Sequence, residues 1–159
     1  MTTVMMPGSY DPITLGHYKL IEQAAHTFDR VYVVVCINPD KKYLFSVDER
    51  IALIRAAVKD IRNVTVASYD GLVVDYVRDY KIDFILKGLR NAADFMYEAE
   101  MAVWNAEHGA KTYFTLPAVG TEKISSTMVR QCLAEGKSIK KLVAPNTFEL
   151  ILKYFEAKK

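Results

Sequence analysis

The amino-acid sequence predicts an α/β fold built on a doubly wound, five-stranded parallel sheet with the strand order 3-2-1-4-5. Residues 31–37 are continuously apolar and rich in β-branched side chains, which is typical of a strand covered on both faces. Similar short apolar runs recur along the chain, and segments with helical spacing separate them. Right-handed crossovers between parallel strands favour the stated order, in which the first and fourth strands are neighbours.

The elements of the first half follow one another as alternating strands and helices. Apolar side chains spaced three or four residues apart predict a first helix between Tyr18 and Phe28 and a second between Ile51 and Ile61. Ser46 and Glu49 have the form of a capping box that opens the second helix. Besides 31–37, strands are expected at residues 3–6, 64–67, 84–86 and 112–116.

The second half continues this alternation. A third helix is predicted from Val73 to Tyr80, a fourth over residues 95–107, and a fifth over residues 127–133. Asn146 is the predicted cap of a last helix, because asparagine is favoured at that position.

The composition is that of a globular protein, with 51% apolar residues, and the 159 residues are expected to form a single domain, 1–159. The formal net charge of +2 is too small for an extended nucleic-acid surface. No signal peptide opens the chain and no apolar run is long enough to cross a bilayer, so we expect a cytoplasmic protein without membrane contact. Cys36 and Cys132 are interpreted as small buried side chains without chemistry of their own.

Two segments are predicted to meet at the sheet edge where a ligand would bind. In an open α/β sheet, the ligand crevice lies beside the carboxyl ends of the strands whose connections leave to opposite faces. The first and fourth strands satisfy this condition. They are followed by residues 7–17 (PGSYDPITLGH) and 87–90 (KGLR), which lie far apart in the sequence.

His17 lies in the first turn of the first predicted helix, with Thr14 as the expected cap. A helix N-terminus presents unpaired N–H groups and a partial positive charge, which attract phosphate and disfavour a protonated imidazole. Gly16 leaves room beside the ring, and Gly8 would let the backbone pass close to a ligand. A single histidine in this place is also compatible with a capped helix that has no catalytic role.

Three further segments add groups that bind phosphate at the same edge. Lys41 or Lys42 follows the second strand, Lys87 and Arg90 follow the fourth, and residues 124–130 (ISSTMVR) follow the fifth. Within the last segment, three hydroxyl residues can cap the fifth helix and offer hydroxyl and N–H groups to an anion. Taken singly, the lysine pair could be a solvated turn and the hydroxyl run a plain cap. Four segments at one edge favour a phosphate site.

These motifs are similar to those of a known superfamily. Residues 14–17 (TLGH), together with residues 124–130, resemble the paired (T/H)xGH and ISSTxxR motifs of the nucleotidyltransferase superfamily. Residues 87–98 (KGLRNAADFMYE), with Met101 and Asn105, further resemble the RGLR…DFxYE…MA…N stretch of the phosphopantetheine adenylyltransferase family. Lys87 stands where that family usually has arginine, which keeps the charge but loses the bidentate fork.

The resemblance implies a Rossmann-like nucleotidyltransferase fold and an enzyme of coenzyme A biosynthesis. Such an enzyme transfers the adenylyl group of ATP to 4′-phosphopantetheine, giving dephospho-coenzyme A and pyrophosphate, with Mg²⁺ as cofactor. The nucleophile is itself a phosphate whose second pKa is about 6, so no general base is required. We find no carboxylate cage for a metal in the sequence and expect Mg²⁺ to rest on ATP oxygens and waters.

The resemblance also implies roles for individual residues. His17 would donate a hydrogen bond to the α-phosphate and act in catalysis with Lys41 and Arg90. The acceptor substrate would contact Ser9, Lys41, Val73, Lys87 and Asn105. ATP would contact Ser9, Tyr10, His17, Gly88, Leu89, Arg90, Glu98, Lys123, Ile124, Ser125, Ser126, Thr127, Met128 and Val129. Without the resemblance, Glu98 is equally well interpreted as an acid on a helix surface.

Two alternative functions stay open. An adenylyltransferase for nicotinamide or nicotinic acid mononucleotide is favoured by the ISSTxxR form of the second motif, whereas Thr14 and residues 87–105 argue against it. A universal-stress-type module would bind ATP without transferring its adenylyl group.

The resemblance further implies a homohexamer and inhibition by coenzyme A. Met101, Val103 and Trp104 of the fourth predicted helix could cover the sheet or meet a neighbouring subunit. Burial in the core is the role that we favour for most of them.

Overall fold

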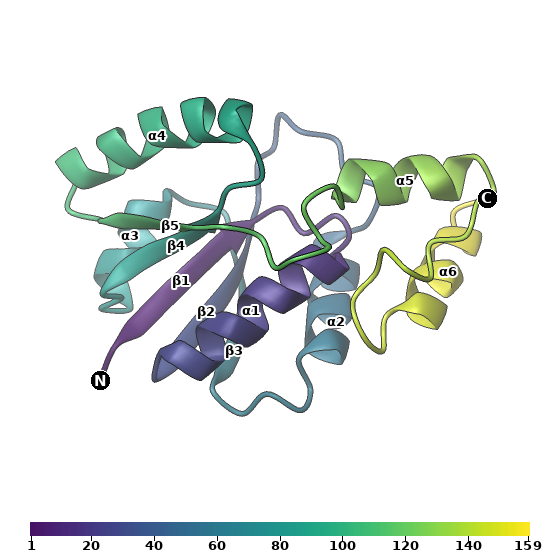
Figure 1. Ribbon diagram of the computed structural model, residues 1–159, viewed down its shortest axis with the longest axis horizontal. Coiled ribbons are helices and arrows are strands. Elements are labelled where there is room, and N and C mark those ends of the chain that lie inside the picture. The colour runs from purple at the N-terminus through teal and green to yellow at the C-terminus, as the bar shows by residue number, and fades with distance from the viewer.

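The computed structural model describes residues 1–159 and confirms the predicted sheet. Figure 1 shows the strands side by side with helices on both faces, and the five parallel strands have the order β3-β2-β1-β4-β5. β1, β3 and β4 each run two residues beyond their predicted ends, because backbone pairing, such as that of Gly8 with Val35, continues past the apolar run. The strands are β1 (Thr3–Gly8), β2 (Arg30–Cys36), β3 (Val64–Tyr69), β4 (Phe84–Gly88) and β5 (Thr112–Thr115).

The helices also follow the predicted alternation, and the main differences lie at the end of α2 and the start of α4. They are α1 (Leu15–Thr27), α2 (Val47–Ala57), α3 (Val73–Asp79), α4 (Ala92–Glu107), α5 (Ser126–Ala134) and α6 (Phe148–Glu156). α2 ends before Ile61, whose N–H donates to the Val58 carbonyl in a turn beyond the helix. α4 begins earlier than predicted because the Asn91 side chain caps it by accepting a hydrogen bond from the Asp94 N–H.

The helix caps are partly as predicted. Thr14, Ser46 and Ser125 each accept a hydrogen bond from the backbone N–H three residues further on. The predicted cap at Asn146 is wrong, because Thr147 occupies the N-cap of α6 and Asn146 has a left-handed φ of 63°. The Asn146 side-chain amide donates to a carbonyl at the end of α2 instead.

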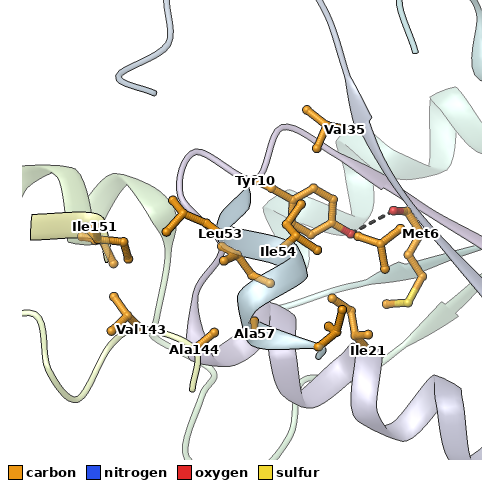
Figure 2. Close-up of a cluster of buried hydrophobic side chains, with 14 of the residues drawn as sticks. Met6, Tyr10, Ile21, Val35, Leu53, Ile54, Ala57, Val143, Ala144 and Ile151 are labelled. Atoms are coloured by element: carbon orange, nitrogen blue, oxygen red, sulfur yellow. Dashed lines mark hydrogen bonds between the residues drawn. The ribbon is translucent and has the colours of Figure 1, made fainter. Parts of the chain in front are cut away.

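Alternate residues of the strands face two separate cores. Val4 and Met6 of β1 face a core shared with α1, α2, α5 and α6, and Figure 2 shows Met6 close to Ile21 of α1 and Ile54 of α2. Met5, between Val4 and Met6, faces a smaller core shared with α3. This alternation places the helices on both faces of the sheet, as a doubly wound fold requires.

α4 contributes little to either core. Asn105 is its one buried residue. Met101, Val103 and Trp104 are 38%, 61% and 41% exposed, so the expectation that most of them lie in the core is wrong. Their apolar pattern forms a helix, but no other part of the chain covers the side of that helix on which they lie.

The segment after α5 returns to the start of α1. Thr14 and Val143 form an isolated antiparallel bridge, and the Leu15 N–H donates to the Leu142 carbonyl at 2.9 Å. α6 then adds Ile151 to the larger core, where Figure 2 shows it beside Leu53 and Val143. The C-terminal part of the chain therefore contacts the turn in which His17 lies.

The two cysteines are free, as expected, but half-buried rather than buried. Cys132 packs at the margin of the larger core, and burial raises the pKa of the Cys36 thiol. A thiol with a raised pKa is a poor nucleophile, so Cys36 is not activated. None of the helices combines the length and the hydropathy needed to span a membrane.

Candidate active site

A cleft of about 320 Å³ opens at the carboxyl ends of β1 and β4, where the sheet order predicts a ligand site. The loop after β1, the first turn of α1 and the starts of α4 and α5 form its walls. Its volume lies within the range of small-molecule sites. The predicted site residues that line it are Ser9, Tyr10, His17, Lys41, Lys87, Gly88, Arg90, Glu98, Ile124, Ser125, Ser126 and Thr127.

His17 is the third residue of α1, and its imidazole takes part in the helix cap. The Thr14 N–H donates to His17 Nδ1 at 3.0 Å, and the His17 N–H donates to Thr14 Oγ1 at 3.3 Å. Because Nδ1 accepts a hydrogen bond, we assign the proton of the neutral ring to Nε2. Nε2 has no hydrogen-bond partner in the protein, so it can donate to a ligand in the cleft.

The surroundings of His17 keep the ring neutral. Burial, and after it the Arg90 guanidinium, lowers the pKa of His17 to about 4. The ring of Tyr10 lies against the imidazole with the two centroids 4.9 Å apart. The imidazole is therefore a neutral hydrogen-bond donor at pH 7, and an aromatic ring rather than a carboxylate supports it.

Gly8 and Tyr10 form the floor of the cleft together. A Cβ on Gly8 would meet Tyr10 Cε2 at 3.0 Å, so the glycine makes room for the tyrosine ring as well as for a ligand. The Tyr10 hydroxyl donates to the Met6 carbonyl at 2.9 Å, as Figure 2 shows. Since the hydroxyl is engaged, a contact of Tyr10 with ATP would have to come from its ring or its backbone.

Two lysines reach the cleft, one from the loop after β2 and one from β4. Lys41, in the loop after β2, donates from Nζ to Ser9 Oγ at 3.2 Å. Lys87, on β4, forms an ion pair with Glu98 of α4 at 3.0 Å, and both side chains are about one-fifth exposed. Lys42 does not line the cleft. Lys41 is thus free of carboxylates, whereas Lys87 shares its charge with Glu98.

Arg90 connects the two sides of the cleft. Its Nε pairs with Asp94 at 3.2 Å, and its Nη1 donates to the Ile124 carbonyl at 3.4 Å. Ile124 precedes the capping residue of α5, so Arg90 links the end of β4 to the start of that helix. This arrangement leaves a guanidinium beside a helix N-terminus, where an anion is stabilised by both.

The first turn of α5 presents free N–H groups to the cleft. Ser125 Oγ accepts from the Met128 N–H at 3.1 Å, and Ser126 Oγ donates to the Pro12 carbonyl at 2.8 Å. The backbone N–H groups of Ser126 and Thr127 have no acceptor in the protein. These two N–H groups, more than the hydroxyls, are available to bind phosphate oxygens.

Six predicted site residues do not line the cleft. The Val129 side chain is fully buried in the larger core, and its N–H donates to the Ser125 carbonyl, so no group of Val129 is free for ATP. Val73 packs against the smaller core at the start of α3. Contacts of a substrate with these residues stay predictions that the cleft does not support directly. The six are Val73, Leu89, Asn105, Lys123, Met128 and Val129.

Sequence reasoning missed two residues that hold the site together. The carboxylate of Asp11 accepts hydrogen bonds from the Leu44 and Phe45 N–H groups, both at 2.9 Å, and so ties the loop after β2 to the loop after β1. Arg130 donates from Nη1 to the Asp11 carbonyl at 2.7 Å. Both residues lie within the quoted motifs, but their partners are distant in the sequence, and such contacts leave no periodic signal.

The cleft does not contain a set of protein ligands for a metal. No group of three or more His, Cys, Asp or Glu side chains is arranged to hold an ion. The acidic side chains that line the cleft are already engaged: Asp11 with backbone N–H groups, Asp94 with Arg90, and Glu98 with Lys87. These carboxylates do not fit a protein-held Mg²⁺ site.

Comparison with known proteins decides the family. Residues 5–132 match the model of the cytidylyltransferase-like family. A phosphopantetheine adenylyltransferase of Clostridium beijerinckii is 44% identical over 148 residues, which cover 92% of each chain. The enzyme of the same name from Clostridium tetani is 42% identical over 96% of this chain and 97% of its own. The chain belongs to the phosphopantetheine adenylyltransferase family.

Solved structures agree with the fold. A protein of Vibrio parahaemolyticus assigned as a nicotinate-nucleotide adenylyltransferase superposes with a TM-score of 0.68 at 26% identity, over 98% of this chain and 97% of that one. A bifunctional NMN adenylyltransferase/ADP-ribose pyrophosphatase of Francisella tularensis gives a TM-score of 0.73 at 15% identity, over 98% of this chain and 49% of that one. The predicted Rossmann-like nucleotidyltransferase fold is confirmed.

Proposed function

We propose that the protein transfers the adenylyl group of ATP to 4′-phosphopantetheine, giving dephospho-coenzyme A and pyrophosphate in coenzyme A biosynthesis. The observation that carries this proposal is one cleft in which the neutral Nε2–H of His17 lies among Lys41, Lys87, Arg90 and the free N–H groups of α5. Such a set of donors suits two phosphate-bearing substrates. The names of the relatives support this pair of substrates.

The reaction requires positioning rather than proton abstraction. An oxygen of the phosphopantetheine phosphate attacks the α-phosphorus of ATP, and the bond from that phosphorus to the β-phosphate oxygen breaks. The attacking phosphate is largely ionised at neutral pH, because its second pKa is about 6. His17 would donate a hydrogen bond to an α-phosphate oxygen, where negative charge builds up in the transition state.

The two substrates would occupy different sides of the cleft. We place the phosphate of the acceptor between Ser9, Lys41 and Lys87, and the phosphates of ATP between Arg90 and the start of α5. Because Lys87 is already paired with Glu98, the acceptor phosphate would share this lysine with a carboxylate. Val73 and Asn105 are proposed to lie along the pantetheine arm, beyond the cleft itself.

Mg²⁺ is proposed to arrive with ATP. The cleft carboxylates do not fit a protein-held ion, so the metal would be coordinated by phosphate oxygens and water. The protein itself would supply positively charged side chains around the phosphates.

A second candidate is adenylyl transfer to nicotinic acid or nicotinamide mononucleotide. The ISSTxxR form of residues 124–130 and the likeness to the Vibrio structure favour it. The deciding experiment measures pyrophosphate release from ATP with each acceptor separately. We expect release only with 4′-phosphopantetheine. Release with a mononucleotide would support the second candidate, and ATP binding without release would support a universal-stress-type module.

We also propose a homo-oligomer, specifically a hexamer, located in the cytoplasm, where ATP and the acceptor are present, with coenzyme A as an inhibitor. The exposed apolar side of α4 supports the oligomer. Met96, Val103 and Trp104 are 67%, 61% and 41% exposed, and apolar patches of this kind often mark interfaces.

A further inference from the structure

Arg50 is a buried charge that none of the proposed chemistry uses. It lies in the first half of α2, is 1% exposed, and is the largest fully buried side chain of the protein. Its guanidinium forms no ion pair with any carboxylate. A buried charge without an opposite charge is unfavourable unless hydrogen bonds or aromatic faces compensate for it. The contacts of Arg50 therefore show what it holds in place.

These contacts connect α2 to both loops that carry the acceptor side of the cleft. Nη1 donates to the Ser9 carbonyl at 2.9 Å, and Nε donates to the Ser46 carbonyl at 3.4 Å. The guanidinium also lies over the ring of Tyr43 at 4.0 Å from its centroid. A planar guanidinium can stack on the ring while an N–H in its plane donates to a carbonyl, whereas a lysine ammonium is a compact point charge without this geometry.

The contact with Ser9 fixes the direction of a backbone donor. In a trans peptide, the carbonyl of one residue and the N–H of the next point in opposite directions. Because the Ser9 carbonyl points to Arg50, the Tyr10 N–H points away from α2. This N–H has no acceptor in the protein, and both residues line the cleft. Tyr10 has a left-handed φ of 49°, which few residues other than glycine adopt, and the hydrogen bond from Arg50 adds support to the peptide that precedes it.

The contact with Tyr43 acts on Lys41. Lys41 Nζ lies 5.6 Å from the centroid of the same ring and donates to Ser9 Oγ at 3.2 Å. The Tyr43 hydroxyl in turn accepts a hydrogen bond from the Asn38 N–H at 3.3 Å. Arg50 thus packs against the side chain of Tyr43, which in turn contacts Lys41 and Asn38 of the same loop.

We propose that Arg50 is a positioning residue for the acceptor phosphate. It would orient the Tyr10 N–H through the Ser9 carbonyl and Lys41 through Tyr43, and its unpaired charge would add to the attraction of the cleft for an anion. This inference rests on the proposed function, since it names the acceptor as the substrate that is affected.

The test compares three variants with the wild-type protein. Arg50→Lys keeps the charge but loses the fork. Tyr43→Leu, at a half-buried position, removes the ring that Arg50 and Lys41 share together with the hydroxyl that accepts from the Asn38 N–H. Leu53→Ala, on the same helix and equally buried, is the control for stability alone. The measurements are KM for each substrate, kcat from pyrophosphate release, the calorimetric Kd of 4′-phosphopantetheine, and Tm.

We expect Arg50→Lys to raise KM and Kd for 4′-phosphopantetheine about tenfold, with KM for ATP changed less than about twofold. Tyr43→Leu should change the same constants in the same direction by a smaller factor. Leu53→Ala should lower Tm by at least as much as Arg50→Lys without changing either KM.

Two results would overturn the inference while leaving the proposed function intact. One is a wild-type KM and Kd for 4′-phosphopantetheine in both Arg50→Lys and Tyr43→Leu. The other is an equal rise of KM in Leu53→Ala, which would show a general effect of instability. A wild-type protein that releases no pyrophosphate with 4′-phosphopantetheine would instead reject the proposed function, and this inference with it.

Discussion

His17 is held in one orientation and one protonation state by different neighbours. The Thr14 N–H fixes Nδ1 as an acceptor, and burial lowers the pKa of the ring to about 4. The first contact aims Nε2 into the cleft, and the second keeps the ring uncharged at neutral pH. A neutral donor would suffice for the proposed adenylyl transfer, because the cationic side chains around it already supply positive charge.

Removal of the imidazole tests its role directly. His17→Ala should lower kcat on the order of 10²-fold or more with little change in either KM, because the hydrogen bond would strengthen only as charge builds up in the transition state. Steady-state pyrophosphate release measures this. A variant with near-normal kcat would remove His17 from the mechanism.

The pH dependence gives a second measure of the same side chain. Because the pKa of His17 is lowered to about 4, its charge does not change between pH 6 and 8, and kcat should show no inflection due to the imidazole in that range. Between pH 6.5 and about 4, His17 binds a proton in the unfolded protein but not in the folded one. The free energy of unfolding should therefore decrease as the pH falls through this range. A kcat inflection near pH 6.5 that disappears in His17→Gln would contradict the assignment.

Individual site residues could be predicted where a local pattern marks them. Thr14 and His17 were found because a cap and a first helical turn have fixed spacing. Arg50 and Asp11 were not, because their partners Ser9, Leu44 and Phe45 lie more than thirty positions away in the sequence. Buried polar contacts between loops depend on the tertiary structure, so they cannot be predicted from periodic patterns in the sequence.

The start of α5 is predicted to serve both stability and ATP binding. Ser125→Ala removes the side chain that accepts the Met128 N–H, and loss of such a cap costs about 1 kcal/mol of unfolding free energy. Because the N–H groups of Ser126 and Thr127 would then be less well ordered, KM for ATP should rise several-fold. Denaturant unfolding and steady-state kinetics measure the two effects.

Leu133→Ala is the matched control for this variant. It lies on the same helix and is buried in the larger core, so it should lower stability by at least as much. KM for ATP should stay unchanged, since Leu133 is remote from the first turn. A rise of KM for ATP in both variants would show that helix stability, rather than the cap, controls binding.

Helices and strands could be predicted in number and order, and their errors have local causes. β1, β3 and β4 run past their predicted ends because the backbone ladder continues where side chains cease to be apolar. The sequence predicts a cap at Asn146, but the backbone of Asn146 is left-handed and its side-chain amide contacts α2. Asparagine is favoured in both settings, so its identity alone does not separate them.

The sheet order could be predicted from alternation and handedness alone, and it located the cleft. The environment of α4 could not be predicted, because an apolar helix pattern indicates burial but does not identify the surface that covers the helix. Within one chain, Val103 and Trp104 remain exposed. The proposed oligomer offers the surface that this helix lacks.

The oligomer can be tested by placing a charge on that surface. Val103→Asp, at a position that is 61% exposed, should leave the fold of one chain intact but shift the assembly towards smaller species, because a charge would be buried at the interface. Light scattering after size exclusion measures the mass. Gln131→Asp adds the same charge on α5 and should leave the mass unchanged. Equal masses for wild type and Val103→Asp would exclude this side of α4 as the contact.

The bridge between Thr14 and Val143 connects the end of the chain to the turn that carries the predicted catalytic histidine. Thr14 is the residue that orients His17, and it is pinned by a segment that lies after residue 132, where the match to the family model stops. A shortened chain that ended with α5 would keep every residue of the cleft and still lose the backbone partner of the turn that aims the imidazole.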